Sequence, residues 1–340
     1  MSMRNHIHKK AFYRQTGLTL VEIMVAITLS LVILAGVIEM FVATKQTYRV
    51  EEGLSRVQEN ARYAMTILAK DVRHAGYWGC ANTTPNNLLN AGGGFDFSGP
   101  AIEGTEGASS APDTLTLRGA YSNGIRVEEP FMNTNSAALH ISSNNGLQKG
   151  DIIIVSDCSA SEIFQISGPA QSNVDNGTLN HNTGNTVSPG NNSQNFSKKY
   201  KADANVLKAK QLNYSIQTGV NGLPALFRSE NGGTAEELVE GVESLQVLYG
   251  RDTDSDGVAN RYYTADLITS DAQWEEVVSI RIGLLMQTVE QVGSDTDTRT
   301  YNVAGTSITS SVHSQGRYFR YVINMIIKLR NRGCSTTVGC

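Results

Sequence analysis

The chain has 340 residues and a formal net charge of −4, and 40% of its residues are hydrophobic and 18% charged. This balance excludes a disordered chain and a polytopic membrane protein, and the acidic excess argues against a general nucleic-acid binder. Four cysteines are too few for a small, disulfide-dense scaffold.

Residues 1–17 form a basic leader. All four of its charges are positive, and without it the rest of the chain would carry a formal charge of −8. The apolar run that follows, from Leu18 to Ala43, contains only Glu22 and Glu39 as charges. It is long enough to cross a ~30 Å hydrocarbon core as a helix. Because basic residues stay in the cytoplasm, we expect a single-pass helix and an extracytoplasmic remainder.

The apolar run is too long for the core of a cleaved secretory signal, which usually has about 7–15 residues. A plain signal anchor is the alternative that length and flanking charge alone would favour. A carboxylate near the start of a membrane helix is costly, however, and is normally kept for a function. Glu22 therefore argues against a simple anchor.

The stretch Gly17-Leu18-Thr19-Leu20-Val21-Glu22 resembles the type IV prepilin signal. The resemblance implies that prepilin peptidase cuts after Gly17 and that Leu18 becomes the N-methylated first residue. It also implies that Glu22 pairs with the free amine of a neighbouring subunit, so that each charge reduces the burial cost of the other. Leu18 departs from the phenylalanine that is usual in this family, a change that the peptidase generally tolerates.

Residues 44–76 are amphipathic. Apolar residues recur there every three or four positions, and charged residues, Asp71 among them, are assigned to the opposite face. We expect one helix from about Leu18 to His74, with Gly76 as its C-cap. A coiled-coil stalk is the alternative, but the short, alanine-rich stripe favours packing on a sheet.

Residues 77–340 alternate short β-branched runs with Gly, Asn, Ser and Asp, which is typical of antiparallel sheet. The predicted fold class is α+β and type IV pilin-like, with a long N-terminal helix packed on a mainly antiparallel β-sheet domain. The window 171–197 holds eight asparagines and is predicted to be a flexible surface loop or a disordered insertion. The expected strands are 114–118, 138–141, 151–156, 163–167, 206–217, 225–228, 242–249, 277–287 and 317–329.

Five strings, taken together, resemble the PilW type of minor pilin. The resemblance implies a structural subunit, not an enzyme, that primes or caps assembly at the tip of a type IV pilus and supports twitching motility and adhesion. Its implied partners are other minor pilins, the major pilin, a tip adhesin, prepilin peptidase and the inner-membrane assembly platform. The strings are Ala75–Cys80, Glu237–Glu243, Tyr249–Asp254, Trp274 with Val277–Ile282, and Arg317–Asn331.

Two alternatives remain open. A type II secretion pseudopilin of the J kind shares the signal, although such proteins are usually shorter. A tip adhesin or DNA-uptake module would bind a ligand through the head, but no nucleic acid is expected for so acidic a chain. The one hint of a basic patch is formed by Lys198, Lys199, Lys201, Lys208 and Lys210.

The four cysteines of an extracytoplasmic domain suggest two disulfides, for which three connectivities are possible. The favoured pairs are Cys80 with Cys158 and Cys334 with Cys340. There is no C-x-x-C pair, which argues against a soft metal site.

The stretch from Asp252 to Gly257 matches the first half of a calcium loop, with Asp252, Asp254 and Asp256 as candidate ligands. Tyr263 stands where the bidentate glutamate is expected, so Asn260 is a further candidate. The alternative is an acidic hairpin tip without an ion. Calcium is the one cofactor considered, because the six histidines are scattered and the sequence contains no P-loop or dinucleotide-binding turn.

Overall fold

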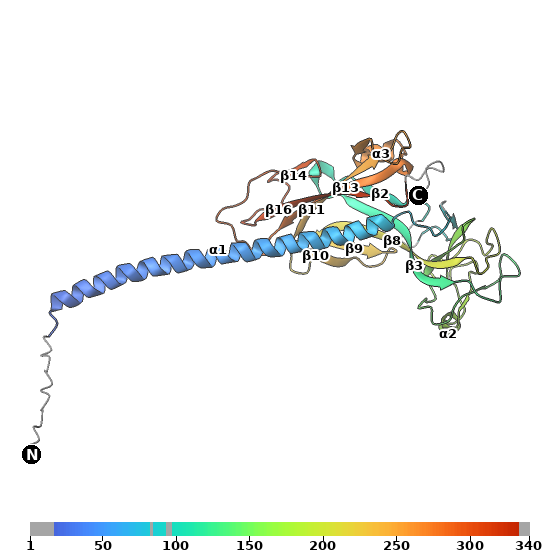
Figure 1. Ribbon diagram of the computed structural model, residues 1–340, viewed down its shortest axis with the longest axis horizontal. Helices are drawn as coiled ribbons and strands as arrows, with labels where there is room; N and C mark the ends of the chain where they lie inside the picture. The colour runs from blue at the N-terminus through green and yellow to red at the C-terminus, as the bar shows by residue number, and fades with distance from the viewer. Residues whose placement is uncertain (1–16, 82–83, 93–96, 333–340) are drawn as a thin grey trace, which may run out of the picture. The chain divides into compact units, whose positions relative to one another are not determined.

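The structure is a computed structural model that describes residues 17–81, 84–92 and 97–332 (Figure 1). The chain divides into two compact units, an N-terminal unit over Met1–Glu52 and a head over Gly53–Cys340. A single helix, α1 (Leu20–His74), supplies residues to both. The predicted pair of Cys334 and Cys340 lies outside the described residues.

Helix α1 begins two residues after the predicted start and ends where it was predicted to end. The chain leaves it through Gly76, whose φ of +76° is the left-handed conformation that favours glycine at this position. The Gly76 N–H donates to the carbonyl of Arg118 at 2.9 Å. The predicted C-cap is therefore confirmed, and it joins the end of the helix to the sheet.

In the head, the apolar stripe of α1 packs on strands. Its residues lie in the largest hydrophobic core together with side chains such as Leu245 and Ile282. Alanines in the stripe let the helix approach the sheet closely, and this confirms the sheet-packed interpretation over the stalk. The fully buried or nearly buried members of the stripe are Val57, Ala61, Ala64, Met65, Leu68, Ala69 and Val72.

Asp71 was predicted on the solvent face, and the structure corrects this. It follows Leu68 by three residues and therefore shares its face, with only 5% of its surface exposed. Its carboxylate accepts hydrogen bonds from the hydroxyls of Tyr214 and Tyr121, the latter at 3.3 Å, and pairs with Nη1 of Arg228 at 3.3 Å. These donors offset the cost of burying a charge and join α1 to three strands.

The larger sheet of the head has eight strands in the order β1-β6-β5-β8-β3-β2, with β9 paired to β8 and β10 paired to β9. Only β1 and β6 run parallel; every other pair in the described sheets is antiparallel. The strands are β1 (Asn86–Asn87), β2 (Ile102–Thr105), β3 (Thr114–Arg126), β5 (Ile152–Ser156), β6 (Ser161–Gln165), β8 (Asn205–Thr218), β9 (Pro224–Glu230) and β10 (Glu236–Glu240).

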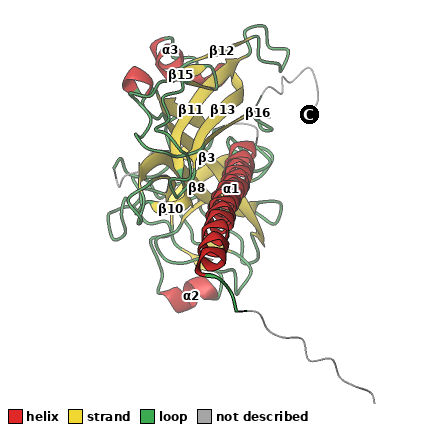
Figure 2. Cartoon of the chain, turned by 90° about the vertical axis from the view of Figure 1, so that its left-hand side faces the viewer, coloured by secondary structure: helices red, strands yellow, loops and turns green. Residues whose placement is uncertain are grey.

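A second sheet has four antiparallel strands in the order β12-β11-β13-β16 (Figure 2). Two short antiparallel pairs, β14–β15 and β4–β7, complete the strands of the described residues. Strands β11 and β13 are buried along almost their whole length. The bounds are β4 (Leu139–His140), β7 (Thr178–Leu179), β11 (Val242–Arg251), β12 (Arg261–Tyr263), β13 (Val277–Gln287), β14 (Tyr301–Val303), β15 (Thr306–Ile308) and β16 (Arg320–Lys328).

The strand pattern confirms the predicted fold class. All nine predicted strands are present, although several have different ends: β3 continues to Arg126 and β16 begins only at Arg320. The prediction missed seven further strands within the described residues, all of them two to five residues long. Two short helices, α2 (Gln171–Asp175) and α3 (Ala265–Ser270), and two 3₁₀ turns, Ala108–Ser110 and Trp274–Glu276, complete the elements.

The asparagine-rich window differs from the predicted surface loop. It contains α2 and β7, and Val174, Leu179 and Phe196 belong to a second hydrophobic core. Asn191 is buried, and its side-chain amide exchanges two hydrogen bonds with the backbone of Gln165, each 2.8 Å long. Asparagine side chains thus form hydrogen bonds with backbone groups that have no partner in a β-sheet ladder.

Candidate functional site

The N-terminal candidate site lies at the start of α1. Gly17 and Leu18 precede the helix and are exposed. Thr19 acts as the N-cap, because its carbonyl accepts from the N–H of Ile23 at 3.2 Å and its hydroxyl accepts from the N–H of Glu22 at 3.3 Å. This places the Glu22 carboxylate in the first turn, where the helix dipole favours negative charge.

Among the residues that the structure describes, none covers the apolar run of α1. Every large apolar side chain from Leu18 to Val42 is exposed, with 70% of the surface of Leu18 and 60% of that of Val42 accessible. Among the described residues, α1 is the one helix long and apolar enough to cross a membrane. Such a surface requires a bilayer or other apolar helices around it.

Glu22 is the acidic residue of this surface nearest the cleavage junction predicted at Gly17. In the part of the chain that the structure describes, its carboxylate makes no hydrogen bond or ion pair. A partner must therefore come from outside these residues if Glu22 is to enter an apolar environment as a charge. The geometry agrees with the predicted role and does not test it.

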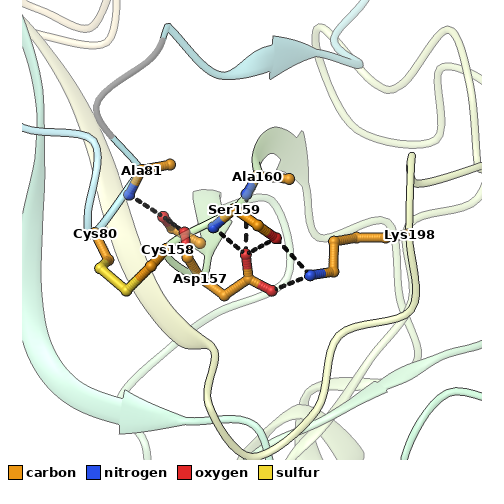
Figure 3. The surroundings of a disulfide bond; sticks show 8 residues. Cys80, Ala81, Asp157, Cys158, Ser159, Ala160 and Lys198 are labelled. Carbon is orange, nitrogen blue, oxygen red and sulfur yellow. Dashed lines mark hydrogen bonds and ion pairs between the residues drawn. A yellow bond between two sulfur atoms is a disulfide. The ribbon is translucent and has the colours of Figure 1, made fainter. Parts of the chain in front are cut away.

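The disulfide between Cys80 and Cys158 confirms one of the two predicted pairs (Figure 3). It links the segment after α1 to the turn between β5 and β6 and spans 78 positions of sequence. On the chain-entropy account a loop of this size contributes about 4 kcal/mol to stability. It therefore ties the end of the helix to the larger sheet covalently.

Beside the disulfide, Asp157 organises the β5–β6 turn (Figure 3). Its Oδ1 accepts from the N–H and the hydroxyl of Ser159, both at 2.8 Å, and from the N–H of Ala160 at 2.9 Å. Lys198 forms an ion pair with Oδ2. Burial alone would raise the pKa of Asp157, but the donors of Lys198, Ser159 and Ala160 outweigh it and lower the pKa to about 2.

The structure brings the three candidate calcium ligands together. One carboxylate oxygen from each of Asp252, Asp254 and Asp256 lies within 4.8 Å of the others. Asp252, however, already accepts from the N–H groups of Asp254, Asp256 and Gly257, the last at 2.7 Å. Asn260 accepts from the N–H of Thr253 at 2.7 Å. Hydrogen bonds within the loop therefore also account for its conformation as an acidic tip without an ion. Calorimetric titration and thermal melting with millimolar calcium distinguish a calcium site from an acidic tip. A calcium site predicts heat of binding and a shift in the melting temperature, and an acidic tip predicts neither.

The lysines that hinted at a basic patch are divided by the structure. Lys198 pairs with Asp157 of the β5–β6 turn. Lys208 and Lys210 lie two residues apart on β8 and pair with Asp151 and Glu230, both at 2.8 Å. Local ion pairs therefore account for three of the five lysines.

A carboxyl cluster that the sequence did not reveal surrounds Glu106. Burial, together with the negative charges of Asp113 and Asp266, raises the pKa of Glu106 to about 7, although the N–H of Ala265 opposes this. Within the described chain, its Oε2 and the hydroxyl of Tyr249 are buried without hydrogen-bond partners. The cluster therefore favours a protonated Glu106 below neutral pH.

Replacing Glu106 by glutamine is expected to stabilise the protein at about pH 8 by about 1 kcal/mol, a value discounted for partial exposure. The folded-state pKa lies above the unfolded one, so ionisation costs stability as the pH rises from about 4.5 to about 7. Glutamine does not ionise, and the gain should vanish near pH 4. Urea denaturation at both pH values checks this, and an equal gain at both would contradict the argument.

A second unpredicted cluster lies at the start of β16. Nε and Nη2 of Arg320 bind the two carboxylate oxygens of Glu243 at 2.6 and 2.9 Å, and Nη1 binds Asp297 at 3.1 Å. All three side chains are at most 4% exposed. The only signal in the sequence was the position of Arg320 inside a predicted strand, where a charge on a buried face requires a partner.

Two segments of the chain match known protein families. Residues 213–331 match the family described as Type IV Pilus-assembly protein W, and residues 13–38 match the Prokaryotic N-terminal methylation motif. Over these two segments the chain is similar to type IV pilins and, in the second half of the head, to the PilW family. The matches confirm the resemblance that the sequence indicated, and they agree with a type IV pilin-like structural protein.

Two proteins of Thermus thermophilus are similar to this chain. The pilin-like protein PilA3 of Thermus thermophilus is 31% identical over 103 residues, which are 30% of this chain and 40% of the relative. The chain thus matches less than half of that relative's length. The solved type IV-like pilin TTHA1219 from Thermus thermophilus is 12% identical, covers 81% of this chain and 96% of its own, and has a TM-score of 0.31.

The PilW match takes in part of the head. It begins inside β8 and includes β9 to β16, with the Arg320 cluster and the acidic loop. The disulfide, the asparagine-rich window and most of the strands of the larger sheet precede it. The matched segment thus contains the whole four-stranded sheet, but only β9, β10 and part of β8 from the eight-stranded sheet.

Proposed function

We propose that this protein is a minor pilin that primes or caps a type IV pilus at its tip and so supports twitching motility and adhesion. Before assembly it spans the inner membrane once, with a cytoplasmic leader that prepilin peptidase removes after Gly17. Leu18 then becomes the methylated first residue. Other minor pilins, the major pilin, a tip adhesin and the inner-membrane assembly platform are its proposed partners.

The observation that carries this proposal is the exposed apolar surface of α1 with a carboxylate in its first turn. The N-terminal methylation motif overlaps this surface and includes Gly17, Leu18 and Glu22. A bilayer satisfies the apolar side chains before assembly, and helices of neighbouring subunits satisfy them afterwards. One surface therefore supports both the membrane and the filament state.

The size of the head supports a position at the end of the filament. About 260 residues follow α1, and they form two sheets and an inserted, packed asparagine-rich segment. A head of this size at every helical step would crowd a dense filament. One copy at an end avoids the clash.

Processing is tested by mass spectrometry of the amino terminus of the chain from the organism that makes it. The expected mature form begins with N-methylated Leu18, and a Gly17→Leu variant should remain as the uncleaved precursor. An amino terminus at Met1 in the unaltered protein, or one beyond the apolar run, would contradict the cleavage site.

Position is tested by labelling the head with gold-conjugated antibodies on intact filaments. We expect label at filament ends and a loss of surface pili when the gene is deleted. Label along the whole filament would exclude a tip role. Normal pili with impaired protein secretion would instead identify a secretion pseudopilin.

A further inference from the structure

A pocket of about 590 Å³ lies in the head between the last turn of α1, strands β3 and β8, and the residues after β16. None of the described residues that line it is acidic. This is unexpected in a chain with an excess of acidic residues. Its basic lining side chains are Arg73, Lys208, Lys210 and Arg330.

Two of these cations are unpaired. Within the described residues, the guanidinium groups of Arg73 and Arg330 make no hydrogen bond or ion pair, and both residues are exposed. Lys208 and Lys210 pair with acidic residues that do not line the pocket. Such partly exposed pairs are weak, so the ammonium groups can also serve a ligand.

The pocket walls are held in place. The rings of His74 and Tyr121 stack with centroids 5.1 Å apart and 13° between their planes. Nζ of Lys210 lies 5.3 Å from the centroid of the Tyr121 ring. Nδ1 of His74 donates to the carbonyl of Lys70 at 2.9 Å, which fixes the imidazole. The basic groups are therefore presented by a packed surface instead of a mobile loop.

The negative end of the α1 dipole would oppose an anion here, but its last carbonyls are occupied. Nδ2 of Asn331 donates to the backbone carbonyls of Arg73 and Ala75 at 3.2 and 3.1 Å. The N–H of Tyr77 donates to the backbone carbonyl of His74 at 3.1 Å. Occupied carbonyls project less negative potential into the pocket. The end of the helix therefore opposes an anion in the pocket less than free carbonyls would.

We propose that this pocket is a binding site for an anionic ligand, held through its carboxylate or phosphate oxygens by Arg73 and Arg330. Guanidinium groups match the planar geometry of these oxyanions and can bind them with two parallel hydrogen bonds. Lys208 and Lys210 add point charges from the sheet. The inference does not depend on the proposed position of the protein in a pilus.

The test measures binding of citrate and of pyrophosphate, in separate titrations, to the full chain in detergent micelles at low salt. At least one anion should bind, and the stronger of the two identifies the ligand chemistry as carboxylate or phosphate. Arg73→Gln and Arg330→Gln should each weaken binding by about tenfold or more, as loss of a charge-assisted pair predicts. Arg62→Gln, an exposed arginine of α1 outside the pocket, is the matched control and should bind like the unaltered protein.

A gain-of-affinity variant separates a ligand site from a structural cluster. Glu230→Gln removes the acidic partner of Lys210 and replaces no residue that lines the pocket, and it should tighten binding severalfold at low salt. Failure of both anions to bind, an equal loss in Arg62→Gln, or no change in Glu230→Gln would each overturn the proposal.

Discussion

Replacing Glu22 by alanine is expected to leave the protein inserted in the membrane, cleaved and methylated, yet absent from filaments. The carboxylate is unpaired within the described chain, and an unpaired charge in an apolar environment costs about 3 kcal/mol. If the free amine of a neighbouring subunit is its partner, losing the pair should reduce incorporation by at least about tenfold, which corresponds to about 1.4 kcal/mol. Immunoblots of sheared filaments and of membranes measure the two pools.

Glu39→Ala provides the control for Glu22→Ala. Glu39 is the other acidic residue of the apolar run and is equally exposed, but it lies four to five turns further along α1. Its replacement should reduce incorporation far less. Filaments that contain Glu22→Ala at the normal level would refute the assembly role of this carboxylate.

Replacing Arg320 by methionine is expected to destabilise the head by about 3–5 kcal/mol, because it leaves two buried carboxylates without their shared partner. Both oxygens of Glu243 and one of Asp297 bind Arg320 in the folded protein. Chemical denaturation of the full chain in micelles measures the loss. Adding Glu243→Gln and Asp297→Asn to the same chain should recover part of it, and a single variant as stable as the unaltered protein would contradict the argument.

The same cluster predicts acid sensitivity. Burial alone would raise the pKa of Asp297, but donors from Arg299, Tyr301 and Arg320 hold it well below its usual range. A carboxyl group whose folded-state pKa is depressed contributes stability above its unfolded value, and this contribution is lost as the pH falls below about 4. The Arg320→Met variant should therefore lose less stability on acidification than the unaltered protein.

The sequence was sufficient for features that depend on local pattern. The apolar run, the cap at Gly76 and the strands with β-branched residues follow from periodicity and turn chemistry, and they were predicted near their observed ends. The pairing of Cys80 with Cys158 also followed, since both flank regular elements. Apart from the disulfide, which joins residues 78 positions apart, these features are determined by residues close to them in sequence.

Features that depend on distant partners were not predictable. The local sequence predicts Asp71 at the surface, but Tyr214 and Arg228, more than 140 positions away, donate hydrogen bonds to its buried carboxylate. The asparagine-rich window resembles a loop until its side chains bind backbone groups of β6. The basic pocket combines Arg73 with Arg330, which no local pattern connects.

Strand β8 has a consequence for recombining this head with that of another pilin. One part of the strand, Asn205–Lys208, pairs with β5, and its later part, Leu212–Thr218, pairs with β9. The family match begins inside the second of these parts, at residue 213. A chimeric protein joined at that boundary would place two unrelated sequences in one strand and disturb both ladders. A junction in the turn at residues 219–223 keeps β8 whole, so it defines the smallest exchangeable module.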